Sequence, residues 1–266
     1  MTAIDTDSVW ALAHAMADAA RVETLALFRG QGLATESKLA DGYDPVTAAD
    51  KASERAMRVL IEAHRPEDAI FGEEEGAKPG TSGYTWVLDP IDGTRGFVSG
   101  TPTWGVLIGL TDASGVRLGI IDQPYIGERF AGGFGRADFT GPHGSGPLKV
   151  RGTTDMSDAI IFTTFPEVGT EAERAGFSAI AARCKLTRYG MDCYAYALLA
   201  AGQIDLVVEA GLHSYDICGP IGVIEAAGGI VTDWRGGPAH NGGRVIAAAT
   251  AELHGEALGV LANMDI

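Results

Sequence analysis

The hydrophobic pattern of this 266-residue chain changes its period along the sequence, and this change limits its fold more than any other feature. The Ala-rich stretch 9–28 predicts a helix. Between residues 52 and 63, apolar side chains recur at the spacing of one helix face, which predicts a second helix. Thr47 and Asp50 have the spacing of an N-cap and its partner, and Pro66 ends the helical pattern.

Strand-like runs follow these two helices. They lie at 84–88, 104–110, 116–122 and 128–134, and the Asp-Ala-Ser-Gly sequence at 112–115 predicts a hairpin between the middle two. Residues 141–147 are rich in Gly and Pro and predict a loop. We take this loop as the boundary between an N-terminal α+β half (1–147) and a C-terminal α/β half (148–266).

In the second half, strand-like and helix-like hydrophobic patterns alternate along the sequence. Its strands are expected at 159–163, 204–209, 230–232 and 245–249, and its helices at 171–184, 193–201, 217–227 and 252–261. Helices and strands that alternate in this way pack as layers. The whole chain is therefore predicted to have an α+β fold.

Charge and composition exclude several classes of protein. There are 20 Lys and Arg against 35 Asp and Glu, a net charge of −15, which argues against a general nucleic-acid surface. No apolar run reaches membrane-spanning length, and the N-terminus lacks a signal-peptide pattern. The 3 cysteines form no CxxC motif. We expect a cytoplasmic protein with no nucleic-acid or membrane partner.

The segment Asp89-Pro-Ile-Asp92-Gly93-Thr94 carries the strongest chemical signal. Two carboxylates follow an apolar strand, Gly93 permits an unusual turn, and Thr94 starts a short helix. Carboxylates beside the amides of a helix start suit a hard cation and a phosphate together. The alternative is an Asx-type turn that caps a helix.

Three further acidic segments have a structural alternative of the same kind. Glu73 lies in a Gly-Glu-Glu-Glu run after the apolar residues 69–71, and such a run is commonly a solvated face. Asp44 and Asp50 bracket the start of the second helix, and Asp216 opens a later one, so each suits a capping position.

Taken in order, these segments resemble the signatures of the inositol monophosphatase superfamily, and the resemblance runs from about residue 10 to the C-terminus. It rests on Gly72-Glu-Glu74, Trp86–Thr94, Tyr215-Asp216 with Glu225–Gly229, and Asp44–Asp50. Three more segments are most similar to its histidinol-phosphate phosphatase branch: Asp92–Phe97, which contains Arg95, Gly119–Pro124 and Arg188–Tyr196.

The resemblance implies a layered α/β/α/β/α sandwich and hydrolysis of a small phosphate monoester. It implies two or three Mg²⁺ ions, for which Mn²⁺ can substitute, and a homodimer. The implied metal ligands are Glu73, Asp89, Asp92 and Asp216 with the Ile91 carbonyl. Asp50 and Thr94 map onto the pair that orients the attacking water, and the amides of Gly93 and Thr94 face the phosphate.

The chemistry of these residues agrees with that implication. Carboxylates gathered in one pocket repel one another and take up protons unless cations neutralise them. Oxygen ligands without His or Cys favour Mg²⁺, Mn²⁺ or Ca²⁺ over zinc. Two or three such ions can lower the pKa of a bound water and hold the phosphate, so no side-chain nucleophile is required.

Asp192 and Glu209 are the candidate specificity residues. Histidinol carries an ammonium and an imidazole, which favour carboxylates, and Asp192 stands where inositol-directed relatives have a small residue. The alternative is that Asp192 caps the helix at 193–201. Arg95 and Arg188 either contact substrate or pair with acids, and Arg95 could also lie on the surface.

The expected reaction is the conversion of L-histidinol phosphate to L-histidinol, a step of histidine biosynthesis. The alternatives are hydrolysis of an inositol phosphate or another small sugar phosphate, and an idle metal-binding or interaction protein on the same fold.

Overall fold

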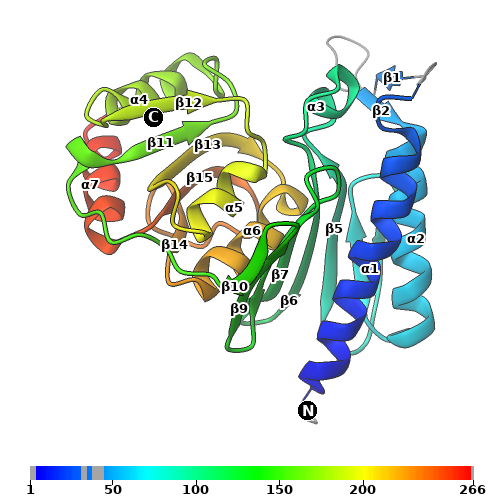
Figure 1. The fold of residues 1–266 in the computed structure, drawn as a ribbon. Helices are drawn as coiled ribbons and strands as arrows, with labels where there is room; N and C mark the ends of the chain where they lie inside the picture. The colour runs from blue at the N-terminus through cyan, green and yellow to red at the C-terminus, as the bar shows by residue number, and fades with distance from the viewer. Residues whose placement is uncertain (1–3, 31–34, 38–44, 265–266) are drawn as a thin grey trace.

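A computed structural model describes residues 4–30, 35–37 and 45–264 of the chain (Figure 1). The two expected N-terminal helices are α1 (Thr6–Leu27) and α2 (Ala48–His64), which lie side by side on one face of a large sheet. Helix α2 begins with a capping box between Thr47 and Asp50, as the spacing predicts. A short ladder of β1 (Thr35–Ser37) and β2 (Pro45–Thr47) precedes it.

The large sheet has eight strands in the order β10-β9-β8-β7-β6-β5-β3-β4. They are β3 (Ala69–Gly72), β4 (Gly76–Lys78), β5 (Thr85–Asp92), β6 (Gly105–Asp112), β7 (Gly115–Gln123), β8 (Glu128–Gly133), β9 (Arg136–Gly141) and β10 (Gly144–Pro147). Neighbours are antiparallel except β3 and β5, which are parallel. The expected β6–β7 hairpin is confirmed. The short helix α3 (Thr94–Ser99) follows β5.

The expectation of a loop at 141–147 is wrong. Residues 144–147 form the edge strand β10, which pairs with β9 as an antiparallel hairpin. Both strands are partly exposed, and β10 has the sequence Gly-Ser-Gly-Pro. Such a strand has no apolar alternation that sequence could reveal, because its pairing depends on backbone contacts with β9.

The second sheet has five strands in the order β12-β11-β13-β15-β14. These are β11 (Ile160–Thr163), β12 (Leu186–Tyr189), β13 (Leu206–Leu212), β14 (Ile230–Asp233) and β15 (Gly243–Ala248). Its helices are α4 (Glu171–Ala181), α5 (Tyr194–Ala200), α6 (Ser214–Ala226) and α7 (Ala251–Leu261), and a 3₁₀ turn spans Met156–Asp158. All were expected except β12 and the 3₁₀ turn. The sequence of β12 has no strand alternation, but its backbone completes the sheet beside β11.

The elements stack in the layers α1/α2, eight-stranded sheet, α5/α6, five-stranded sheet and α4/α7 (Figure 1). Helix α6 packs directly on β6, β7 and β8. This contact requires glycine, because a Cβ on Gly119 of β7 would overlap the carbonyl oxygen of Gly219. The close approach places the start of α6 opposite the end of β5.

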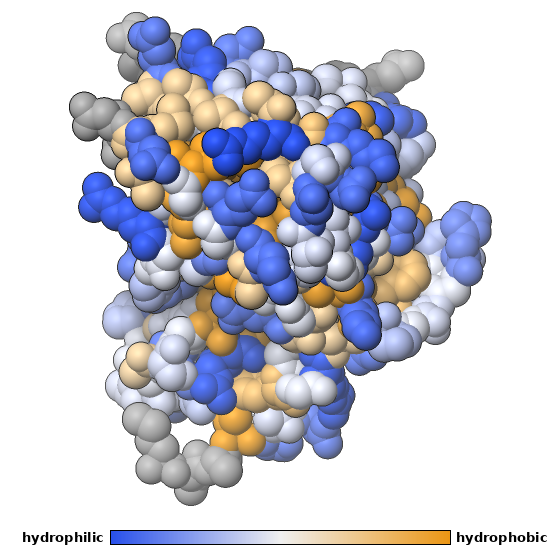
Figure 2. All heavy atoms as spheres, turned by 90° about the vertical axis from the view of Figure 1, so that its left-hand side faces the viewer, coloured by the Kyte–Doolittle hydropathy of each residue, from blue (hydrophilic) through white to orange (hydrophobic). Residues whose placement is uncertain are grey.

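On the face formed by the C-terminal half, hydrophilic side chains are interspersed with small apolar areas (Figure 2). None of the helices in the described part of the chain combines the length and apolarity needed to cross a bilayer.

Candidate active site

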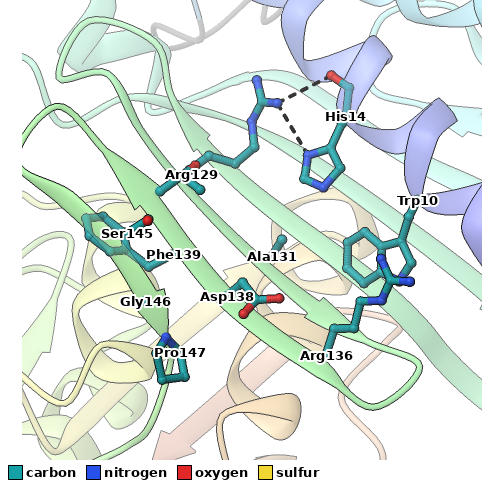
Figure 3. A pocket seen from close by; sticks show the side chains of 11 residues that line it. Trp10, His14, Arg129, Ala131, Arg136, Asp138, Phe139, Ser145, Gly146 and Pro147 are labelled. Carbon is teal, nitrogen blue, oxygen red and sulfur yellow. Dashed lines mark hydrogen bonds between the residues drawn. The ribbon is translucent and has the colours of Figure 1, made fainter.

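One cavity of about 420 Å³ lies between α1 and strands β8–β10, away from every predicted site residue (Figure 3). Its cations are already neutralised by nearby acids. Arg129 lies 2.7 Å from Asp18 and 2.6 Å from Asp122, and Arg136 pairs with Asp7. These paired charges tie α1 to the sheet and leave little attraction for a charged ligand.

A second cavity of about 330 Å³ brings the predicted residues together. It lies where the end of β5 meets the start of α6, and the loops after β11 and β12 form its other wall. The predicted residues in its lining are Glu73, Asp92, Gly93, Thr94, Arg95, Asp192, Glu209 and Asp216. Both halves of the chain therefore contribute to one site.

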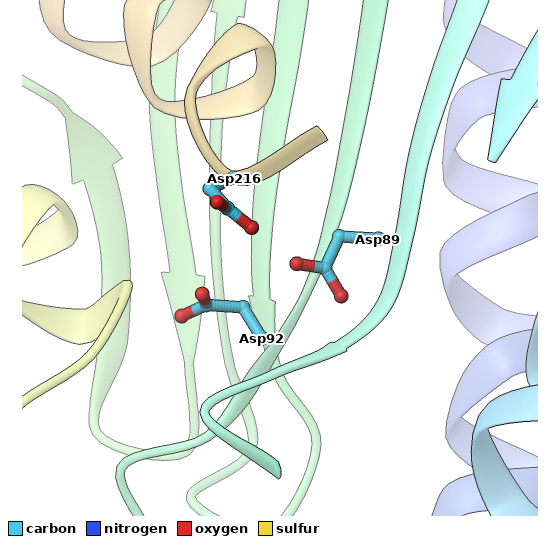
Figure 4. A group of neighbouring side chains, drawn as sticks. All are labelled: Asp89, Asp92 and Asp216. Carbon is cyan, nitrogen blue, oxygen red and sulfur yellow. The ribbon is translucent and has the colours of Figure 1, made fainter. Parts of the chain in front are cut away.

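Asp89, Asp92 and Asp216 form a cluster at the inner end of this site (Figure 4). One carboxylate oxygen of each lies within 4.8 Å of the others. Backbone amides hold all three: Asp89 Oδ1 accepts a hydrogen bond from Ile91 N at 3.0 Å, Asp92 Oδ2 from Cys193 N at 2.6 Å, and Asp216 Oδ2 from His213 N at 2.6 Å. The turn and cap proposed as alternatives are thus present, and they aim the carboxylates at one another.

Burial and mutual repulsion disfavour the charged forms of this cluster. Burial and the charges of Glu73, Asp92 and Asp216 raise the pKa of Asp89, while burial and the charges of Asp192 and Asp216 raise the pKa of Asp92. Burial raises the pKa of Asp216 to about 6. A divalent cation would relieve this repulsion, and the oxygen-only donors suit Mg²⁺, Mn²⁺ or Ca²⁺. The residues present therefore fit a hard metal ion.

The turn after β5 explains why Gly93 is required. Its φ of +80° is left-handed, and a Cβ there would lie 2.7 Å from Asp192 Cγ. Pairing of β5 with β6 is irregular between Asp89 and Asp92, which separates the two carboxylates from the regular ladder. Thr94 Oγ1 donates to the Ile91 carbonyl at 3.0 Å, so the hydroxyl and this carbonyl lie together at the site.

Asp50 has a capping role and one further available oxygen. Its Oδ2 accepts from Thr47 N at 2.8 Å and from Thr47 Oγ1 at 2.7 Å. Its Oδ1 is buried and has no hydrogen-bond partner in the described structure. Burial raises the pKa of Asp50 to about 6. In the described part of the chain no hydrogen bond joins Asp50 to Thr94, and Asp44 lies outside the described residues.

Asp192 and Glu209 also line the cavity. Asp192 lies next to the aspartate cluster, because the amide of the following residue, Cys193, donates to Asp92 Oδ2. Asp192 does not cap the following helix, because α5 begins after Cys193 without a side-chain cap. Its Oδ2 instead accepts from Thr103 Oγ1 at 3.0 Å. Glu209 is 5% exposed and accepts from Thr164 N at 2.6 Å, and burial raises its pKa to about 7. Both carboxylates are held where a substrate can reach them.

Arg95 and Arg188 differ in their position relative to the cavity. Arg95 lines the cavity, with its guanidinium 5.1 Å from the centroid of the Phe165 ring. Arg188 is exposed on β12 and is not among the residues that line the cavity. We therefore assign no substrate contact to Arg188.

Glu54 of α2 is fully buried beneath the loop that carries Glu73. Its carboxylate accepts from Glu74 N at 2.7 Å and Glu75 N at 3.0 Å, and Arg58 pairs with it at 2.8 Å. Gly72 has no room for a Cβ beside this carboxylate. The four-residue spacing of Glu54 and Arg58 indicates a pair but not its burial.

Comparison with known proteins finds relatives along nearly the whole chain. The sequence model of the inositol monophosphatase family matches residues 3–264. The bifunctional phosphatase IMPL2 of Arabidopsis thaliana is 38% identical over 96% of this chain and 75% of its own, and the histidinol-phosphatase of Streptomyces coelicolor is 34% identical over 94% and 95%. An inositol monophosphatase structure from Zymomonas mobilis superposes with a TM-score of 0.84 at 37% identity, covering 98% of this chain and 100% of the other. The expected fold is confirmed.

Proposed function

The chain belongs to the inositol monophosphatase family of phosphatases, and on that premise we propose that it hydrolyses L-histidinol phosphate to L-histidinol and phosphate with Mg²⁺ as its cofactor. The observation that carries the choice of substrate is that the carboxylate residues Asp192 and Glu209 line the same cavity as the turn of Gly93 and Thr94. A cationic leaving group suits these two carboxylates. Relatives named histidinol-phosphatase support the same choice.

Each part of the site has a role in this reaction. Glu73, Asp89, Asp92 and Asp216, with the Ile91 carbonyl, would hold the metal, which supplies a water of lowered pKa and neutralises phosphate charge. Asp50 Oδ1 is available to accept a proton from the attacking water, and the Thr94 hydroxyl orients it. The amides of Gly93 and Thr94 bind phosphate oxygens.

Phosphate release tests this function. We would assay the protein on histidinol phosphate, inositol 1-phosphate and glycerol 2-phosphate, after removal of divalent ions and after addition of Mg²⁺ or Mn²⁺. We expect activity only with the metal. We also expect kcat/KM to be roughly 10–100-fold higher for histidinol phosphate than for the other two esters, which corresponds to the free energy of one good charge-assisted hydrogen bond. A preference for inositol 1-phosphate would support the activity named for the Zymomonas mobilis protein instead. Absence of turnover on all three esters would favour an idle metal-binding protein.

Replacing Asp192 tests recognition of the substrate ammonium. Asp192 has a φ of +46°, which Asn also tolerates, so Asp192→Asn should keep the fold. Loss of the charge should lower kcat/KM for histidinol phosphate by roughly 10–200-fold.

Glycerol 2-phosphate is the matched substrate for this variant, because it has no ammonium. We expect its hydrolysis to change little. Equal losses on the two esters would show that Asp192 maintains the site rather than recognising the ammonium.

A further inference from the structure

The loop between β11 and α4 forms the outer wall of the active-site cavity and is fastened at its start. Thr164 donates from its backbone N and its hydroxyl to Glu209, at 2.6 and 2.9 Å, and its carbonyl accepts from Gly190 N at 3.0 Å. The next residue, Phe165, lines the cavity and remains 42% exposed. An aromatic ring is thus held at the rim by a fixed backbone.

The surroundings of Phe165 favour a positively charged, flat group. Glu167, Asp192 and Glu209 line the same cavity as Phe165, and the Glu209 carboxylate is bonded to the neighbouring Thr164. The Arg95 guanidinium, itself flat and cationic, lies 5.1 Å from the ring centroid, so the ring already makes one contact of this kind.

We infer that Phe165 is a specificity-determining contact that stacks against a flat, protonatable ring of the leaving group, the imidazole in the case of histidinol phosphate. This inference rests on the proposed function. Ring pairs favour offset or edge contacts with centroids about 4.5–7 Å apart, and stacking covers apolar area that both rings otherwise expose to water. The acidic residues that line this cavity favour the protonated form of the imidazole ring.

A pair of esters that differ only in the ring tests this contact. The phosphate ester of 2-amino-1-propanol keeps the phosphate and the ammonium of histidinol phosphate but lacks the imidazole. The measured quantity is the ratio of kcat/KM for the two esters, because it cancels effects on metal binding and chemistry. We expect Phe165→Ala to lower this ratio roughly 5–30-fold.

Two further variants separate stacking from structural damage. Phe165→Tyr retains the ring and should keep the ratio within about threefold of wild type. Tyr189 is also 42% exposed, on the neighbouring strand β12, but does not line the cavity. Tyr189→Ala should leave the ratio unchanged, which controls for loss of an exposed aromatic residue.

The outcomes also separate this inference from the proposed function. If the wild type prefers histidinol phosphate to inositol 1-phosphate and Phe165→Ala leaves the ratio unchanged, only the stacking contact is overturned. The same holds if Tyr189→Ala lowers the ratio as much as Phe165→Ala. A wild type with no preference for histidinol phosphate overturns both.

Discussion

Asp89→Asn is expected to lower kcat by at least ~10³-fold, because metal interactions supply several kcal/mol of transition-state stabilisation. Asp89 belongs to the aspartate cluster with Asp92 and Asp216, and it is 1% exposed. Asparagine nearly preserves its volume and removes its charge. Steady-state phosphate release and Mg²⁺ titration measure the loss.

Asp68 provides a matched control, since it is another aspartate that is 1% exposed but lies at the opposite end of the parallel β3–β5 pair. It precedes β3, pairs with Arg65 and accepts from Trp86 Nε1 at 2.9 Å. Asp68→Asn should lower the melting temperature and leave kcat of the folded protein near wild type. Activity of Asp89→Asn within tenfold of wild type would contradict its assignment as a metal ligand.

Thermal melts in a chelator give a second readout of the same variant. Burial and neighbouring charges raise the pKa of Asp89, so the folded state disfavours its ionised form at neutral pH. Asp89→Asn should therefore melt above the wild type without metal, while gaining less stability from added Mg²⁺. A lower melting temperature in the chelator would show that Asp89 stabilises the fold.

Short sequence motifs predicted much of this site because helix caps and turns, which depend on residues close in sequence, arrange its backbone. The capping box of Thr47 and Asp50 forms as its spacing predicts, and Gly93 adopts the left-handed conformation expected of a turn glycine. A carboxylate of this site can make a structural hydrogen bond and still have an oxygen for the role that we propose. Asp216 accepts the His213 amide with one oxygen and also faces Asp89 and Asp92.

Contacts distant in sequence were beyond local reasoning. The amide that holds Asp92 belongs to Cys193, 101 positions later, and only the packing of the two halves brings them together. Glu54 has the spacing of a surface ion pair but is buried, because the Glu73 loop folds over it. Arg188 lies in a segment that resembles active-site sequence, and the position of β12 at the sheet edge leaves it exposed.

Asp50→Asn is expected to lower kcat by roughly 10²–10⁴-fold with little change in Mg²⁺ affinity, the range typical of lost general-base function. Only Oδ2 is used by the cap, and asparagine can still accept from Thr47 with its amide oxygen. The buried Oδ1 has no partner in the described structure, and its replacement removes the oxygen that we propose accepts the proton. Thr94→Ala should lower kcat in the same range, since it removes the hydroxyl that we propose orients the water.

The capping box of α4 is the control that separates the two roles of Asp50. Glu173 accepts from Thr170 N at 2.7 Å and occupies the position in α4 that Asp50 occupies in α2. Glu173→Gln and Asp50→Asn both keep an oxygen that can accept the threonine amide, so the change at each cap should cost about 1 kcal/mol or less of stability. Glu173→Gln also removes the ion pair with Arg244. Only Asp50→Asn should lower kcat. If both variants lose stability and both retain normal kcat, Asp50 is a helix cap alone, and a different group must accept the proton of the attacking water.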